Sequence, residues 1–291
     1  MTRLPEPAAL DRLAAIAAET YGAPSRDCVV PAPGTQILLA PIAALVRRGK
    51  AAVLGPTYGE FARAAALAGH DVTEVEDVEH LRDADLAVVA NPNNPDGRVL
   101  KKPDLLSLAA ARGGRGLLVI DEAFMDVGPA GASLAGEVAR HNIVVLRSFG
   151  KFFGLAGLRL GFALARPEIA SRLAAALGPW AVSGPAIMIG QKALADSEWV
   201  RTMRERLEQE ARRTDAALAD VGVQLGGTSL FRLVRMSAAN RLFHHLGHTG
   251  ILARRFPERP EWLRFGLPGN EASWDRLSAA LAAWQRLSGR T

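Results

Sequence analysis

Short apolar runs alternate with amphipathic stretches along the first two thirds of the chain. Near-continuous apolar runs predict buried strands at residues 50–55, 84–90, 116–124, 142–149 and 158–165. Helical periodicity predicts helices between them at residues 36–48, 60–70 and 102–112. Apolar strands that alternate with helices are typical of a parallel sheet covered on both faces. We therefore expect an α/β domain with a mostly parallel sheet sandwiched by helices.

The pattern changes after Gly190. Residues 196–222 predict one long charged amphipathic helix, followed by strand-like runs at 228–236 and 261–267. Helical patterns lie at 238–250 and from Glu271 onward. We expect residues 21–195 to form a large domain and residues 196–291 a small α+β domain, with residues 1–20 as a segment that packs with the small domain.

Composition and charge narrow the class of protein. The 291 residues are 49% hydrophobic with a single cysteine, Cys28, which favours an ordinary globular chain in a reducing compartment. The first ten residues contain no apolar signal core, so we expect a cytoplasmic protein. The net charge of +5 is spread over scattered arginines, without the basic block of a nucleic-acid-binding protein.

The longest uncharged run, residues 173–190, is nearly long enough to cross a membrane. Gly178-Pro179 and Gly184-Pro185 interrupt it, and these dipeptides end helices. We therefore expect a broken, buried connector and no membrane span.

Polar residues follow the predicted strands at their carboxyl ends. These are Tyr58, the segment 91–97 (NPNNPDG), Asp121, and the segment 148–151 (SFGK). Because ligands bind beyond the carboxyl ends of the strands in open parallel sheets, we expect these positions to converge on one crevice. Lys151 is the one lysine of five with apolar neighbours on both sides. A solvated lysine in a tight turn is the alternative.

Each of the other candidates also has a structural explanation. Gly34, Thr35 and Gln36 open a helix, where amide groups suit a phosphate or form an ordinary cap. Asn94 can reach a ligand or simply complete a turn, and Asp121 can serve a ligand or a salt bridge. His244 and His248 lie on one helical face, but a solvated face suits them better than zinc. We expect no metal site.

A lysine amine, a carboxylate, an asparagine, a tyrosine and several phosphate donors together suit one cofactor, pyridoxal 5'-phosphate. A lysine can hold its aldehyde covalently, and a carboxylate can keep its pyridine nitrogen protonated.

The order of the motifs GTQ, PTYGEF, NPNNPDG, DEAF, SFGKFFGLAGLRLG and LRFGL resembles the fold-type I pyridoxal-phosphate enzymes of the aminotransferase class I/II family. The resemblance runs from Pro31 to Gly269. It implies that the large domain binds the cofactor, with Lys151 holding it, Asp121 pairing with the ring nitrogen, and Tyr58 stacking on the ring as a further catalytic residue. Asn94 would bond the ring hydroxyl. The residues implied for the cofactor phosphate are Gly34, Thr35, Gln36, Ser148 and Arg159.

Within this family the sequence resembles two groups that act on phosphorylated amines: the threonine-phosphate decarboxylases of cobalamin biosynthesis and the histidinol-phosphate aminotransferases. Phe124 in DEAF, where the aminotransferases usually carry a tyrosine, favours the first group, as do GGTSLFRLV and LRFGLPGNE. The resemblance departs from the family pattern at RLPEP, where Leu4 replaces an expected tyrosine.

This resemblance implies decarboxylation of L-threonine O-3-phosphate to (R)-1-amino-2-propanol O-2-phosphate by a homodimer. The alternatives are an aminotransferase acting on histidinol phosphate or a related amine, and a chain that binds the cofactor without turnover. The resemblance also implies that Arg264 and Arg254 bind the substrate, along with Asn94. Our hypothesis is that the two arginines hold its phosphate, which leaves the carboxylate free to leave as carbon dioxide.

Overall fold

The computed structural model describes residues 3–114 and 116–288, and the chain forms two compact units. The first unit consists of Met1–Asn94 and Val99–Glu198, and the second of Pro95–Arg98 and Trp199–Thr291. The chain therefore enters the second unit twice, the first time for only four residues.

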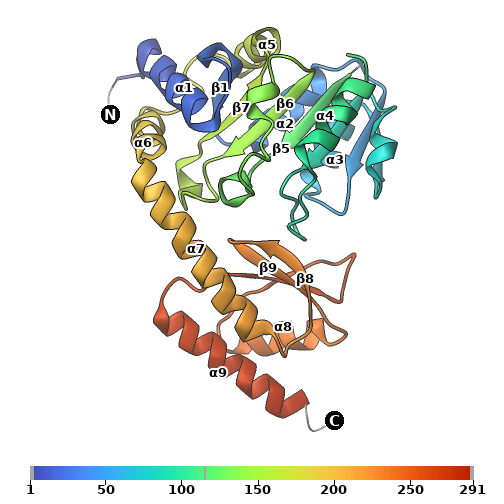
Figure 1. The fold of residues 1–291 in the computed structure, drawn as a ribbon, viewed down its shortest axis with the longest axis vertical. Coiled ribbons are helices and arrows are strands. Elements are labelled where there is room, and N and C mark those ends of the chain that lie inside the picture. The colour runs from blue at the N-terminus through green and yellow to red at the C-terminus, as the bar shows by residue number, and fades with distance from the viewer. Residues whose placement is uncertain (1–2, 115, 289–291) are drawn as a thin grey trace. The chain divides into compact units, whose positions relative to one another are not determined.

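A seven-stranded sheet forms the centre of the first unit (Figure 1). Its order is β1-β7-β6-β5-β4-β2-β3. Strands β2 to β6 run parallel, whereas β7 is antiparallel to both of its neighbours, β6 and β1. The strands are β1 (Val29–Ala32), β2 (Lys50–Leu54), β3 (Asp71–Val75), β4 (Leu86–Ala90), β5 (Leu117–Asp121), β6 (Ile143–Ser148) and β7 (Gly161–Ala165).

Helices cover this sheet because its strands carry apolar side chains on both faces. Three of them, α2 (Gln36–Ala44), α3 (Glu60–Leu67) and α5 (Pro167–Leu177), share one apolar core with the sheet, in which Leu38, Ile42 and Val119 are buried. Helix α4 (Lys102–Ala111) joins β4 to β5 in the direction opposite to the β2-α3-β3 connection. A right-handed crossover therefore places α4 on the other face.

Helix α1 (Pro7–Tyr21) belongs to the first unit and packs on α6 (Gly184–Ala195) of the same unit. Its buried face includes Leu13, whose side chain lies against Gly190, where an added Cβ would come within 3.1 Å of it. Gln191 also donates a hydrogen bond to the carbonyl of Ala9 at 2.7 Å. This apolar face and the close approach at Gly190 tie α1 to α6.

The uncharged run 173–190 is two helix segments joined by a loop, so it is broken as expected, but the expectation that this connector is buried was wrong for part of it. Helix α5 ends at Leu177 and is capped by Gly178, which has φ +74°, and α6 begins after Ser183, whose side chain accepts a hydrogen bond from the Ala186 amide. Trp180 and Met188 are 57% and 63% exposed. The apolar residues of the run divide between core and surface because both helices are amphipathic. Within the described residues, no helix is long and apolar enough to cross a membrane.

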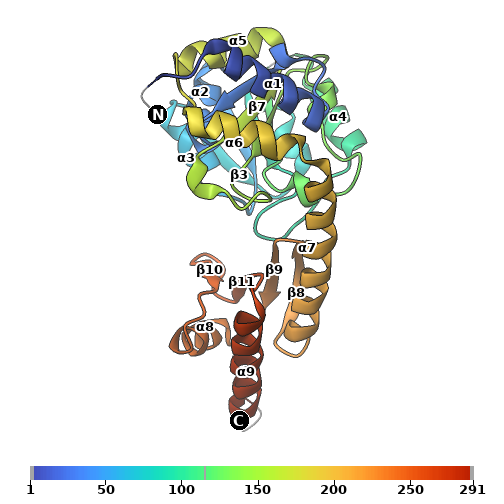
Figure 2. The same ribbon diagram turned by 90° about the vertical axis from the view of Figure 1, so that its left-hand side faces the viewer.

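The second unit has a four-stranded antiparallel sheet of order β10-β11-β9-β8. Its core is formed by apolar residues of the sheet and helices, including Leu242, Leu263 and Trp274. Figure 2 shows the backbone of this unit. Its elements are α7 (Ser197–Leu218), β8 (Val223–Thr228), β9 (Phe231–Arg235), α8 (Ala239–His248), β10 (Arg254–Arg255), β11 (Trp262–Gly266) and α9 (Glu271–Ser288).

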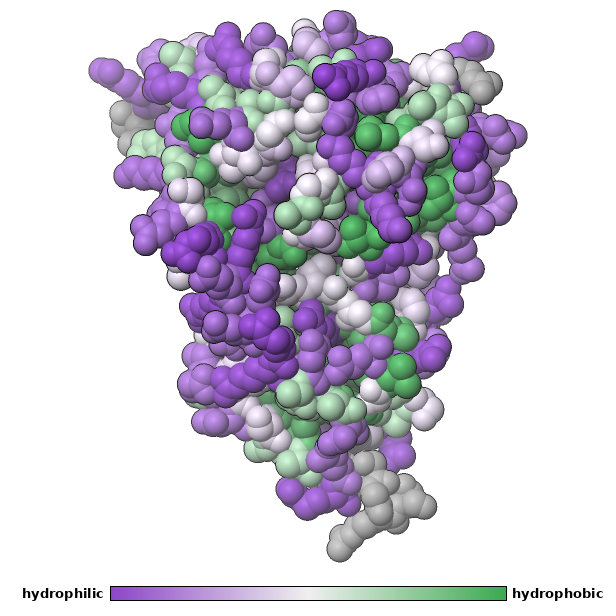
Figure 3. All heavy atoms as spheres, viewed as in Figure 1, coloured by the Kyte–Doolittle hydropathy of each residue, from purple (hydrophilic) through white to green (hydrophobic). Residues whose placement is uncertain are grey.

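Charged side chains cover most of α7 and pair along it, as Arg201 does with Glu205 at 2.8 Å; Figure 3 shows the many hydrophilic residues on this surface.

Residues 95–98 lie against β8 of the second unit. Gly97, with φ +74°, lies so close to Gly227 that an added Cβ would collide with the Gly227 carbonyl. Only glycine fits this contact.

Candidate active site

A pocket of about 210 Å³ lies in the first unit, next to the carboxyl ends of β4, β5 and β6. All nine residues that the sequence suggested for cofactor binding line it: Gly34, Thr35, Gln36, Tyr58, Asn94, Asp121, Ser148, Lys151 and Arg159. Residues spread over some 125 positions of the chain thus meet at one point, because parallel strands bring their carboxyl ends to the same edge of the sheet.

Lys151 follows β6 and reaches the pocket from a loop. Its Nζ lies 5.7 Å from the centroid of the Phe124 ring, a distance at which a cation interacts with an aromatic face. The residue is exposed, which differs from the apolar surroundings that its neighbours in the sequence suggested. Those neighbours turn inward instead: Phe149 and Phe153 stack with centroids 4.3 Å apart and hold the loop in place.

Asp121 ends β5 and faces the pocket. Burial raises the pKa of its carboxyl from 3.8 to about 7, although the Ala123 amide, Lys151 and Arg147 each lower it. The Ala123 N–H donates to Asp121 Oδ1 at 3.2 Å. A carboxyl of this kind becomes an anion readily when a cation comes to lie against it.

The segment from Asn91 to Asn94 is held rigidly by side chains that the sequence analysis did not assign. The side chain of Asn91 accepts a hydrogen bond from the Leu100 amide at 2.8 Å and donates one to the Leu100 carbonyl at 3.2 Å. Asn93 accepts from the Thr57 hydroxyl at 2.7 Å and donates to the Pro56 carbonyl at 3.0 Å. These bonds fix Asn94 at the pocket and join its loop to the one that carries Tyr58.

Arg159 and the start of α2 form a cradle of donors at one end of the pocket. Arg159 has a left-handed backbone, with φ 54°, and its guanidinium lies over Gly34, where an added Cβ would be 2.6 Å from Nη2. At Gly161 an added Cβ would be 2.7 Å from the Thr35 amide nitrogen, so glycine is required there too. Cationic and backbone N–H donors gathered at a helix N-terminus suit an anion. The role of Gly161 was missed, and the glycine between two apolar residues in LRLGF was the available signal.

Tyr58 is joined to this cradle. Its hydroxyl donates to Gln36 Oε1 at 3.2 Å, and Gln36 Nε2 donates to Glu60 at 2.8 Å. Tyr58 is 43% exposed, and its ring meets that of Phe61 edge-on with centroids 5.6 Å apart. One aromatic face therefore remains available to a planar ligand in the pocket.

Arg254 and Arg264 belong to the second unit, where they face each other across the β10–β11 ladder. Side chains of residues paired in this way lie on the same side of a sheet. Burial and, secondly, the charge of Arg254 lower the pKa of Arg264, although it remains a cation. His244 and His248 lie on α8, and no group of three potential metal ligands occurs among the described residues.

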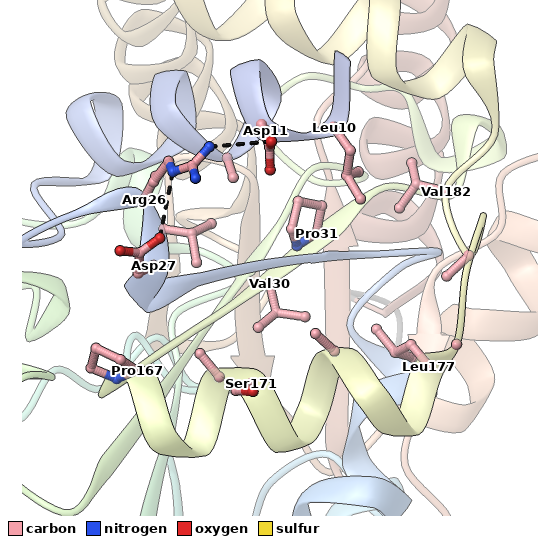
Figure 4. Close-up of a pocket in the computed structure, with 16 residues that line it drawn as sticks. Leu10, Asp11, Arg26, Asp27, Val30, Pro31, Pro167, Ser171, Leu177 and Val182 are labelled. Atoms are coloured by element: carbon pink, nitrogen blue, oxygen red, sulfur yellow. Dashed lines mark ion pairs between the residues drawn. The ribbon is translucent and has the colours of Figure 1, made fainter. Parts of the chain in front are cut away.

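A second hollow of about 480 Å³ in the first unit lies between α1, β1 and α5 (Figure 4). Its charged residues are Asp11, Arg26 and Asp27, and Arg26 pairs with both acids at 3.2 and 3.4 Å. The remaining lining is mostly apolar. This hollow lacks the convergent nucleophile, acid and anion donors that the first pocket contains.

Comparison with known proteins places this chain in a family. Residues 5–281 match the family model of aminotransferases of class I and II, so the chain belongs to that family.

Individual relatives within this family show which enzymes the chain is similar to. The chain is 43% identical over 289 residues to the threonine-phosphate decarboxylase of Pseudomonas aeruginosa, covering 98% of this chain and 85% of the relative. It is 43% identical over 285 residues to the enzyme of the same name from a Sinorhizobium species, covering 96% and 84%. Among solved structures, the histidinol-phosphate aminotransferase of Sinorhizobium meliloti in complex with pyridoxal-5'-phosphate aligns with a TM-score of 0.87 at 25% identity, covering 96% of this chain and 82% of that one.

Proposed function

We propose that this protein is a pyridoxal-phosphate-dependent decarboxylase that converts L-threonine O-3-phosphate to (R)-1-amino-2-propanol O-2-phosphate in cobalamin biosynthesis. One observation supports this most strongly. A lysine amine, a half-buried carboxyl and an anion cradle share one pocket, in a chain that is 43% identical to threonine-phosphate decarboxylases.

The pocket fits the proposed cofactor. The donors of Thr35, Gln36, Ser148 and Arg159 suit its phosphate, and Gly34 leaves room for the Arg159 guanidinium. The Asp121 carboxyl suits its ring nitrogen, since a protonated nitrogen is a further cation that favours the ionised carboxylate. When bound, pyridoxal phosphate supplies an electron sink for negative charge that develops at the substrate Cα.

The polar residues around the cofactor ring each have a proposed task. Lys151 Nζ holds the cofactor and is the amine placed to move a proton at Cα. Asp121 keeps the ring nitrogen protonated, while Tyr58 supports the ring face and Asn94 donates to the ring hydroxyl. Phe124 offers Lys151 an aromatic face with no hydroxyl, so Asn94 is left as the proposed side-chain partner of that ring oxygen.

Arg254 and Arg264 are the proposed ligands of the substrate phosphate. Two guanidinium groups on the same side of neighbouring strands repel each other, and a dianion between them removes that repulsion. If both arginines grip the phosphate, the substrate carboxylate is not held by them. It can then be oriented for loss as carbon dioxide.

The alternative function is transamination of histidinol phosphate or a related amine, which the similarity to the S. meliloti aminotransferase favours. Purified protein loaded with pyridoxal phosphate should release carbon dioxide from L-threonine O-3-phosphate with no keto acid present. If it releases none, yet consumes histidinol phosphate together with 2-oxoglutarate, the decarboxylase assignment is wrong and the aminotransferase is right.

We also propose that the protein is a cytoplasmic homodimer. Exposed apolar residues of the first unit support a partner surface: Trp180, Met188 and Ile189 lie on α6 and the loop before it. A monomeric mass in sedimentation equilibrium at micromolar concentration would contradict the dimer.

A further inference from the structure

A buried cluster of three charged side chains lies next to Asp121. Arg147 in β6 donates from Nη1 to Glu122 at 3.0 Å and from Nη2 to Asp126 at 2.6 Å. Arg147, Glu122 and Asp126 are 4%, 0% and 5% exposed. Charged groups are rarely buried to this extent unless they are paired, and here one cation serves two anions.

The surroundings complete this charged cluster. Glu122 also accepts hydrogen bonds from the Ser133 hydroxyl at 2.6 Å and the Leu134 amide at 2.8 Å. The Arg147 guanidinium lies 4.4 Å from the centre of the Tyr21 ring. Burial, followed by the charge of Asp126, raises the pKa of the Tyr21 phenol above its ordinary value, so the phenol stays neutral. The charged groups of the cluster are therefore two carboxylates and one guanidinium.

The cluster also fixes the turn that presents Asp121. The Glu122 amide donates to the Leu146 carbonyl at 2.9 Å, and the Met125 amide donates to the Glu122 carbonyl at 3.0 Å. Arg147 grips the turn at positions 122 and 126, on either side of Ala123. The Ala123 amide, which donates to Asp121, is therefore held in place from both directions.

Four ionisable groups act electrostatically with Asp121. Glu122 comes from its own turn, Arg147 from β6, Lys151 from the loop after β6, and Tyr58 from the loop before α3. Burial has the largest effect on Asp121 and raises its pKa; Lys151 and Arg147 lower it, and Glu122 raises it. The cluster thus acts on Asp121 with two opposite charges.

We propose that Arg147, held by Glu122 and Asp126, is the positioning group for Asp121: its guanidinium locks the turn from residue 121 to residue 126, so that the Asp121 carboxyl faces the cofactor ring, and its charge opposes that of Glu122 at this carboxyl. Filling space does not require charge, because apolar residues of equal volume fill a core at least as well. This inference rests on the proposed cofactor site and is independent of which substrate the enzyme takes.

The test measures binding of pyridoxine 5'-phosphate, which has an alcohol in place of the aldehyde and so cannot join Lys151. Its fluorescence gives the dissociation constant from pH 5.5 to 8.5 for the wild type and for Glu122→Gln, Arg147→Lys and Arg147→Met. Ionisations of the ligand itself are common to all four proteins. Differences in the pH at which binding is lost therefore report the environment of Asp121.

A positioning role predicts shifts of opposite sign. Glu122→Gln removes a negative neighbour and should move the midpoint to lower pH, and Arg147→Met should move it to higher pH, each by about 0.5–1 unit, or roughly 3- to 10-fold in affinity at a fixed pH. Arg147→Lys keeps the cation and should stay within about 0.3 unit of the wild type while binding more weakly, since the fork is lost.

A purely structural cluster would weaken binding equally at every pH and leave the midpoint unmoved, and that result overturns the proposal. If Arg147→Met does not fold, Glu122→Gln and Arg147→Lys decide the question by the same criterion. If wild-type protein does not bind pyridoxine 5'-phosphate, the cofactor site itself is wrong and the inference falls with it. Failure to decarboxylate threonine phosphate would leave the binding result intact.

Discussion

Replacing Asp121 by asparagine should make the cofactor-free protein more stable at alkaline pH. The native carboxyl has a pKa of about 7 because it is buried, against 3.8 for its ordinary value. In the unfolded chain it loses its proton near pH 4, so the native state binds more protons than the unfolded state between those values. Its contribution to stability therefore falls as the pH rises through this window. An asparagine side chain stays neutral over this whole pH window, so the variant does not lose stability in this way.

The size of the effect follows from the same values. Each pH unit of the window is worth about 1.4 kcal/mol, so ionising Asp121 costs the native state up to ~4 kcal/mol, and about half of that where water in the open pocket screens the charge. Between pH 5 and pH 8, the free energy of unfolding of Asp121→Asn relative to wild type should rise by roughly 1.5–3 kcal/mol.

Urea unfolding of the two apoproteins at both pH values measures this difference. Asp71→Asn, at an exposed position at the start of β3, is the matched control and should show no such change. If the relative stability of Asp121→Asn changes by less than ~0.5 kcal/mol, which is the error of the measurement, the argument that burial holds this carboxyl protonated is refuted. Saturating pyridoxal phosphate should reverse the order, because its ring nitrogen favours the ionised wild-type carboxyl.

Three further outcomes test the site. Lys151→Ala should retain no covalently bound cofactor after borohydride reduction, measured by mass spectrometry, whereas an equal yield from the variant would exclude Lys151 as the attachment point. Arg264→Gln should raise the KM for threonine phosphate about 30- to 100-fold, as expected for loss of a charged hydrogen bond. The control Arg255→Gln removes a guanidinium that is bonded to Asn240 and should leave KM within about twofold. Equal effects of the two substitutions would argue against a specific phosphate ligand. Gly34→Ala should weaken cofactor binding at least about tenfold, since the new Cβ meets Arg159 and the left-handed backbone resists alanine. Gly131→Ala, at a left-handed position with open space, controls for backbone strain alone. Equal losses of cofactor binding in both variants would contradict the proposed role of Gly34 and Arg159 in binding the phosphate.

The sequence predicted those parts of the fold where burial is continuous. The apolar runs that became β2, β4, β5 and β6 are buried over most of their length, so pattern and structure agree. Strand β3 was not predicted, because it lies at the edge of the sheet and all of its residues are exposed or half-buried. Strand β1 was not predicted either, since it has only four residues and contains Pro31.

The position of the candidate site followed from one topological rule, but its supports did not. Polar residues at strand ends had to meet at one edge of a parallel sheet, and they do. The partners of Arg147 lie 25 and 21 positions away, and those of Asn93 lie 36 and 37 positions away. No local pattern indicates such pairings, because the tertiary fold alone brings them together. The sequence left the exposure of Lys151 open for the same reason: its apolar neighbours face the interior, and it does not.

The short segment of residues 95–98 that belongs to the second unit has a practical consequence for the design of truncated proteins. Residues 95–98 belong to that unit although a hundred residues separate them from the rest of it, and Gly97 fits tightly against Gly227. A gene fragment that begins at Trp199 would encode the second unit without residues 95–98. The glycine residues of β8 against which these residues lie would then be uncovered. A truncated protein that retains the complete second unit would need residues 95–98 joined to it through a designed linker. Expressing the chain from Trp199 onward alone is therefore the wrong strategy.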